Sequence, residues 1–117
     1  MKIASYDFPC HIKGNTFKDK IFKIENVADT ISTPIDLTGA EVLMQFKESE
    51  DSEMVFEFKT SNNTILLTNA ADGELKMVKR TLDVSAGKYI YDLKVTFPGN
   101  YIKTFFKGNI TIEKNIS

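Results

Sequence analysis

Residues 88–97 constrain the fold of this chain more than any other stretch, because apolar and polar side chains alternate along them almost without a break. A period of two places successive side chains on opposite faces of a β-strand. Only Ile90 falls among the polar positions. The stretch therefore predicts a long strand with one buried face, whose residues are Tyr89, Tyr91, Leu93, Val95 and Phe97.

The start of this strand also has the pattern of a tyrosine corner, a motif of immunoglobulin-like sandwiches. In that motif a tyrosine near the start of a strand caps a loop through its hydroxyl, two residues before a position often held by cysteine. Here Gly87 precedes the strand, Tyr89 takes the tyrosine position, and Tyr91 takes the later one.

Other segments with strand patterns recur along the chain, separated by turn signals such as Asp72-Gly73 and Pro98-Gly99. About seven strands in roughly 100 residues predict an all-β, immunoglobulin-like, antiparallel sandwich of two sheets. A small closed barrel uses the same strand pattern and remains the alternative. The other strand-like segments are 17–25, 40–47, 54–59, 64–68, 75–78 and 102–112.

Length and composition predict one domain that is held together by packing. The chain of 117 residues suits a single β-sandwich over 13–117, preceded by an N-terminal arm or edge strand over 1–12. A formal charge of −1 gives no bulk attraction for nucleic acid, and Cys10 is the only cysteine, so no intrachain disulfide is possible. Residues 1–8 lack the apolar run of a signal peptide, and no stretch approaches the roughly 20 apolar residues that span a bilayer. We therefore expect no membrane contact, and a location in the bacterial cytoplasm or in a viral particle.

Two residue groups suggest chemistry, but weakly. Cys10 and His11 are adjacent, and neighbours in an extended strand point to opposite faces, which is unsuited to a nucleophile and its base. The acidic run over 48–53 offers carboxylates for calcium, but it lacks the glycine and the ligand spacing of a known calcium loop. We expect a solvated turn there, no catalytic or metal-binding residue, no cofactor and no enzyme activity.

Some apolar residues fall on the polar side of the strand patterns. If the core faces are as assigned, these residues point outward and form a candidate subunit interface. The alternative is that the N-terminal segment, through Ile3, Tyr6, Phe8 and Ile12, folds over that face. The candidate interface residues are Leu43, Ile90, Tyr101 and Phe105.

The order of short motifs resembles a group of small phage and prophage proteins, similar to the N-terminal module of phage baseplate upper proteins. Residues 34–40 read Pro-Ile-Asp-Leu-Thr-Gly-Ala, residues 87–93 read Gly-Lys-Tyr-Ile-Tyr-Asp-Leu, and residues 108–112 read Gly-Asn-Ile-Thr-Ile. Lys13-Gly14-Asn15-Thr16-Phe17 and Asp72-Gly73-Glu74-Leu75 belong to the same series, so the resemblance covers about residues 13 to 113.

The resemblance implies an immunoglobulin-like structural part of a phage tail or baseplate, which acts by self-association or by contact with other tail proteins. It implies architectural rather than catalytic residues: Asp36 caps the turn at Thr38, Gly39 permits that turn, and Gly87 and Tyr89 shape the corner. The first dozen residues do not match the family pattern, and no long downstream extension follows, so we expect a small accessory or connector.

A carbohydrate- or small-ligand-binding sandwich is the alternative function. Sugar platforms often use exposed aromatic side chains, and Tyr6, Tyr101 and Phe105 are the candidates here. The chain contains no tryptophan, which weighs against this alternative.

Overall fold

The computed structural model describes residues 4–28 and 31–114, and this part of the chain is built from β-strands and two 3-10 turns. The predicted all-β class is confirmed. The strands are β1 (Ala4–Ser5), β2 (His11–Ile12), β3 (Thr16–Phe17), β4 (Lys20–Lys23), β5 (Glu25–Ala28), β6 (Ile31–Pro34), β7 (Glu41–Lys47), β8 (Met54–Lys59), β9 (Ile65–Asn69), β10 (Glu74–Met77), β11 (Arg80–Thr81), β12 (Gly87–Phe97) and β13 (Tyr101–Glu113). The turns are η1 (Thr60–Asn62) and η2 (Ala70–Asp72).

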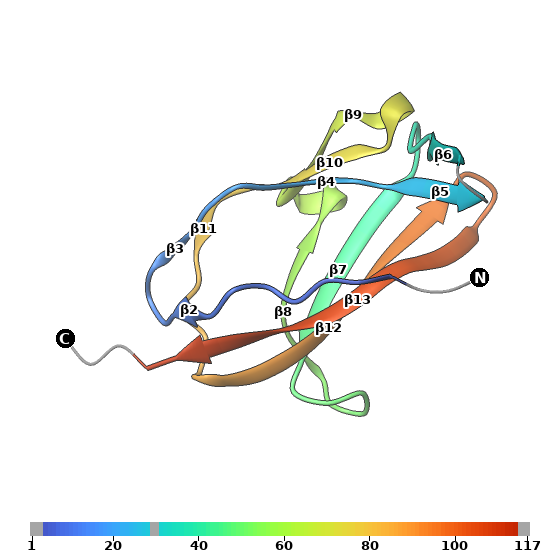
Figure 1. Ribbon diagram of the computed structural model, residues 1–117. Helices are drawn as coiled ribbons and strands as arrows, with labels where there is room; N and C mark the ends of the chain where they lie inside the picture. The colour runs from blue at the N-terminus through green and yellow to red at the C-terminus, as the bar shows by residue number, and fades with distance from the viewer. Residues whose placement is uncertain (1–3, 29–30, 115–117) are drawn as a thin grey trace.

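The largest sheet has the strand order β1-β13-β12-β7-β8, and β2 also pairs with β13 (Figure 1). The long strands β13, β12, β7 and β8 are antiparallel, whereas β1 and β2 run parallel to β13. The described part of the N-terminal segment therefore forms one edge of this sheet, and β8 forms the other.

Three smaller sheets contain the remaining strands. They have the orders β4-β10-β9, β11-β3 and β5-β6, and the pairs within them are antiparallel. One extended run of the chain contains β3, β4 and β5, and another contains β10 and β11 (Figure 1). Short breaks divide each run into separate strands. The described strands thus divide among separate sheets.

The hydrophobic core lies between the large sheet and the smaller sheets. Rings from the two sides meet there: Phe22 of β4 lies 5.0 Å from Phe106 of β13, measured between ring centroids. Phe17 of β3 likewise lies 5.7 Å from Phe58 of β8. The predicted buried face of β12 is confirmed, since Tyr89, Tyr91, Leu93 and Val95 are buried and Phe97 is half-buried; the alternate residues of β7, Val42, Met44 and Phe46, are buried with them.

The N-terminal segment packs along β13 by backbone hydrogen bonds. The Tyr6 N–H donates to the carbonyl of Lys107, and the Phe8 N–H donates to the carbonyl of Asn109, each at 2.9 Å. Phe8 is buried in the core, with its ring 5.2 Å from that of Tyr91. The segment therefore contributes to the core and does not cover the outer face of the sheet.

Two features of the neighbouring strands allow this close approach. The Tyr91 hydroxyl donates a 2.6 Å hydrogen bond to the Tyr6 carbonyl. At Gly108, a Cβ atom would overlap that same carbonyl. A glycine is therefore required where the N-terminal segment crosses β13.

The residues implied to be architectural lie in two tight turns. Asp36 Oδ1 accepts hydrogen bonds from the Thr38 hydroxyl at 2.6 Å and from the Thr38 N–H at 2.9 Å, and these bonds lower the pKa of Asp36. Gly39 follows with a φ of 76°, a region that costs little strain only for glycine. At the other turn Gly87 has a φ of 154°, and the Tyr89 hydroxyl donates a 2.5 Å hydrogen bond to the Ser85 carbonyl.

The substitution Gly108→Ala is expected to detach the N-terminal segment, because the added methyl group has no space beside Tyr6. We expect a loss of about 2 kcal/mol in unfolding free energy, as is typical of overpacking. Amide hydrogen exchange should accelerate at Tyr6 and Phe8, whose N–H groups bond to β13. Tyr91→Phe, which removes the hydroxyl without adding volume, should accelerate the same two amides less. Unchanged exchange at both positions in Gly108→Ala would contradict this account.

Tyr89→Phe is expected to destabilise the fold by about 1 kcal/mol, the usual net contribution of one hydrogen bond. The ring remains to fill the core, and the Ser85 carbonyl lies at an exposed residue where water can replace the hydroxyl. Urea unfolding should therefore show a lower midpoint with an unchanged slope. A wild-type midpoint would show that the corner bond does not contribute to stability.

Candidate interaction surfaces

The four residues predicted to form one outward patch do not lie together. Leu43 and Ile90 lie half-buried on the outer face of the large sheet. Tyr101 begins β13 and is 60% exposed. Phe105 instead packs against the hydrophobic core, so its prediction as an outward residue is wrong.

A β-bulge in β13 is the physical reason for this difference. Leu93 of β12 pairs with Phe106, but the next residue, Lys94, pairs with Thr104, so Phe105 is an extra residue. An extra residue in one strand reverses which side chains face the core. Ile102 has the same sequence parity as the buried Phe106 and Ile110, but because it precedes the bulge it is 63% exposed and lies opposite Thr96.

The bulge also gathers three aromatic side chains at one end of the sheet. Tyr101 pairs with Phe97, and their ring centroids lie 5.9 Å apart. The ring of Phe105 lies 6.1 Å from that of Phe97, and Lys103 Nζ lies 5.2 Å from the centroid of the Phe105 ring. We call Phe97, Tyr101 and Phe105 the aromatic end of the molecule.

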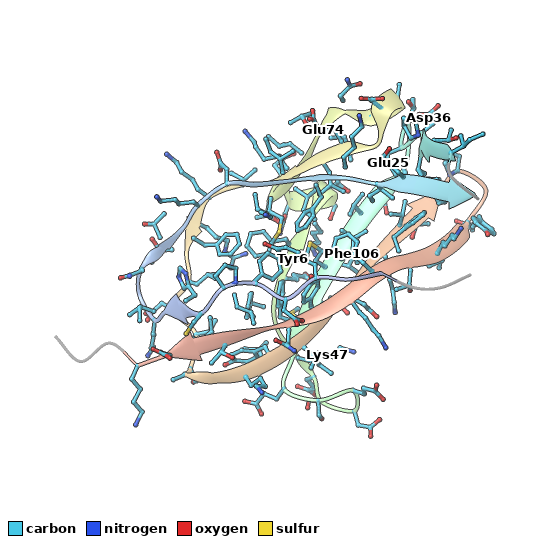
Figure 2. All side chains as sticks on the ribbon, viewed as in Figure 1. Tyr6, Glu25, Asp36, Lys47, Glu74 and Phe106 are labelled. Carbon is cyan, nitrogen blue, oxygen red and sulfur yellow. The ribbon has the colours of Figure 1, made fainter. Side chains whose placement is uncertain are left out.

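A mainly apolar pocket of about 280 Å³ adjoins the aromatic end, between the N-terminal segment and β4. Tyr6 and Phe106 lie beside each other there (Figure 2), and the ring of Phe22 lies 5.3 Å from the former and 5.0 Å from the latter. Lys20 Nζ lies 4.8 Å from the centroid of the Tyr6 ring, a cation–π distance. Such a pocket can accept a small apolar or aromatic group. Its lining residues are Tyr6, Phe22, Lys23, Ile24, Glu25, Phe105 and Phe106.

The structure thus brings together two of the three aromatic residues that the ligand-binding alternative named. Tyr6 and Phe105 line this pocket, whereas Tyr101 is not among its lining residues. The residues missed by sequence reasoning are Phe22 and Phe106. Each was expected to be part of a strand, and only the packing of β4 against β13 brings their rings together.

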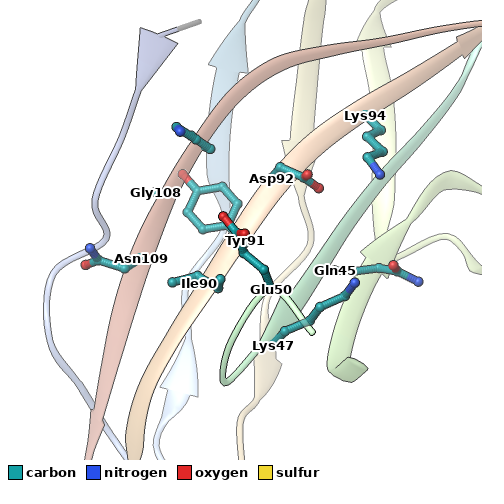
Figure 3. Close-up of a pocket in the computed structure, with 10 residues that line it drawn as sticks. Gln45, Lys47, Glu50, Ile90, Tyr91, Asp92, Lys94, Gly108 and Asn109 are labelled. Carbon is teal, nitrogen blue, oxygen red and sulfur yellow. The ribbon is translucent and has the colours of Figure 1, made fainter. Parts of the chain in front are cut away.

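The outer face of the large sheet carries a different, charged surface. A hollow of about 530 Å³ lies over β7, β12 and β13, with Ile90 at its floor and Asp92 and Lys94 beside it (Figure 3). A second hollow of about 350 Å³ adjoins it and shares Gln45. The first is lined by Gln45, Lys47, Glu50, Ile90, Tyr91, Asp92, Lys94, Lys107, Gly108 and Asn109.

Few charges on this outer face form ion pairs with other residues that the structure describes. The Lys59 ammonium lies 2.8 Å from the Glu57 carboxylate and lowers its pKa. Lys47, Asp92 and Lys94 take part in none of the ion pairs found between described residues. The face therefore presents exposed or half-buried charges that remain available to a partner.

Cys10 and His11 have separate hydrogen-bond partners. His11 Nε2 lies 3.0 Å from the Asn15 carbonyl oxygen, and a hydrogen bond to Glu113 raises the pKa of the exposed Cys10 thiol, which opposes thiolate formation. Across residues 4–28 and 31–114, no three His, Cys, Asp or Glu side chains form a group that could hold a metal ion. The acidic residues Glu48, Glu50, Asp51 and Glu53 are exposed.

Comparison with known proteins does not assign this chain to a family. No helix in the described part of the chain is long and apolar enough to cross a membrane. No protein-family model matches the chain, and no curated protein sequence matches it.

Proposed function

We propose that this protein is a non-enzymatic structural module of a phage or prophage particle, associated with the tail or baseplate, and that it acts through protein–protein contact. The sequence resemblance to the N-terminal module of baseplate upper proteins supports a location in a phage particle. The exposure of Tyr101 at the aromatic end supports action through protein–protein contact.

The same proposal includes an immunoglobulin-like sandwich of the variable type. In such folds one sheet contains strands G, F, C and C′, and a second sheet contains strands B, E and D. The orders β13-β12-β7-β8 and β4-β10-β9 correspond to these two sheets. The hydrogen bond from the Tyr89 hydroxyl to Ser85 also has the geometry of a tyrosine corner. A fold of this kind offers a rigid scaffold on which loops and faces can bind partners.

The observation that carries the assembly role is the exposure of Tyr101 at the aromatic end. Its side chain is 60% exposed, although its ring contacts Phe97, which packs against the core. Tyrosine and phenylalanine are enriched in protein interfaces because they bury a large area at a small cost in side-chain entropy. We therefore assign contact with another particle protein to the aromatic end.

Incorporation into particles tests this function. The tagged chain should co-purify with phage particles from induced cells of its source, and Tyr101→Asp should reduce incorporation about tenfold or more, because a charge would enter an apolar contact. Ile21→Asp is the matched control: Ile21 is also exposed, at 57%, but it lies on β4 of a smaller sheet, so this variant should incorporate normally. Circular dichroism should show that both variants are folded. A wild-type chain absent from the particles would refute the particle role.

The apolar pocket supports ligand binding as the second candidate function. Its volume of about 280 Å³ can hold a single sugar ring or an aromatic group against Tyr6 and Phe22. In a glycan and fragment panel monitored by NMR, a bound compound should then shift the signals of these two residues, and Phe22→Ala should abolish the shift at Tyr6. No binding at millimolar concentration would exclude this candidate.

A further inference from the structure

The charges that β7, β8 and β12 present on the outer face of the large sheet follow an order that becomes visible only when the strands are paired, and Lys107 of β13 lies beside them, paired with Asp92. Along β7 the outward residues begin with Glu41 and end with Lys47, and the uncharged Leu43 and Gln45 lie between them. An acid and a base thus occupy opposite ends of the same strand. Reversing the direction of β7 exchanges the two charges.

The strands on either side of β7 have the same property. Asp92 and Lys94 are successive outward residues of β12, and Glu57 and Lys59 are successive outward residues of β8. Reversing either strand again places a base where an acid was. Within residues 41–47, 57–59 and 92–94 each charge is therefore complementary to the charge that reversal brings opposite it, whereas Lys88 at the start of β12 has no such counterpart.

When a strand is turned end for end, its central residue keeps its place. The central residues of the three reversed segments lie in a single row across the sheet. The centre is Met44 on β7, Leu93 on β12 and Phe58 on β8. Met44 pairs with Leu93 on one side and with Phe58 on the other. One rotation can therefore reverse all three strands at once, which isolated strand patterns do not guarantee.

We propose that a second copy of this chain docks on this face. The two copies are related by a two-fold axis, which lies between them, runs perpendicular to the strands and passes above this row. This dimer rests on the assembly function proposed above. Its partner is a second copy of the chain, and its contact surface is the outer face of the large sheet. The pairing places Asp92 opposite Lys94 of the second copy, Glu41 opposite Lys47, and Glu57 opposite Lys59. Because the axis is two-fold, each pair occurs twice.

Several charged side chains of this face can form ion pairs across such a contact. Lys47, Asp92 and Lys94 have no ion pair within the described part of the chain, so docking need not break one at these positions. Leu43 would meet Gln45 of the second copy, and Ile90 would meet Thr96, which buries the half-exposed apolar groups of the face. The adjoining hollows of about 530 and 350 Å³ leave room for the long lysine side chains.

The size of the face predicts weak association. Strands lie about 4.8 Å apart and rise about 3.3 Å per residue, so four strands of seven residues cover roughly 400 Å² on each copy. The two copies would together bury about 800 Å², less than the roughly 1,000 Å² expected of a stable specific complex, and the contact is mainly ionic. We therefore expect a dimer that forms at low ionic strength and dissociates as salt screens the charges.

The test exchanges charges between the copies. Lys94→Asp alone places acids opposite acids, and Asp92→Lys alone places bases opposite bases, so each variant should self-associate about tenfold or more weakly than the wild type. In an equimolar mixture the heterodimer places both acids of the first variant opposite both bases of the second, which restores the attraction at positions 92 and 94. Sedimentation velocity in about 20 mM salt should therefore show monomers for each variant alone and dimers for the mixture.

Lys18→Asp and Asp83→Lys are the matched controls. They make the same changes in net charge, but at exposed positions outside this face, so each should self-associate like the wild type. The proposal is overturned if Lys94→Asp dimerises normally, if the mixture remains monomeric, or if the wild type is monomeric at about 1 mM in low salt. Particle incorporation is measured separately, so the assembly function can stand when this dimer fails.

Discussion

The β-bulge at Phe105 determines which side chains each half of β13 presents to the core and to solvent. Beyond the bulge, Phe106, Ile110 and Ile112 are buried and complete the core. Before it, the order is reversed, and the aromatic end forms beside the apolar pocket. One extra residue thus separates a stable core from an exposed aromatic surface along a single strand.

The other half of the large sheet depends on how closely the N-terminal segment approaches β13. Gly108 leaves space for the Tyr6 carbonyl, and the Tyr91 hydroxyl binds that carbonyl from the core side. This crossing places Phe8 in the core and Tyr6 against the pocket. The pocket is therefore a product of three separate segments of the chain, namely the N-terminal segment, β4 and β13.

The sequence predicted those parts of the fold that depend on local alternation and turn chemistry. The buried face of β12 and the all-β class followed from a period of two, and hydrogen bonds from Thr38 to Asp36 and from Tyr89 to the Ser85 carbonyl close the two turns. The outward assignment of Phe105 failed because a bulge is a property of the pair β12–β13, and position parity counted along residues 101–113 takes no account of it. Phe22 and Phe106 were not recognised as a site because they meet only through the packing of two sheets. The self-complementary charges were equally invisible, since they depend on the register of three strands.

The two candidate surfaces differ in the physics of their contacts, which gives each a separate role. A two-fold contact is closed, since each copy uses its charged face once and no further copy can be added there. The aromatic ends of both copies then remain available, and their apolar contacts depend little on salt. The proposed dimer would present two identical aromatic surfaces to larger partners, which is the behaviour expected of a connector. Salt would then control pairing of the copies without controlling attachment to the particle.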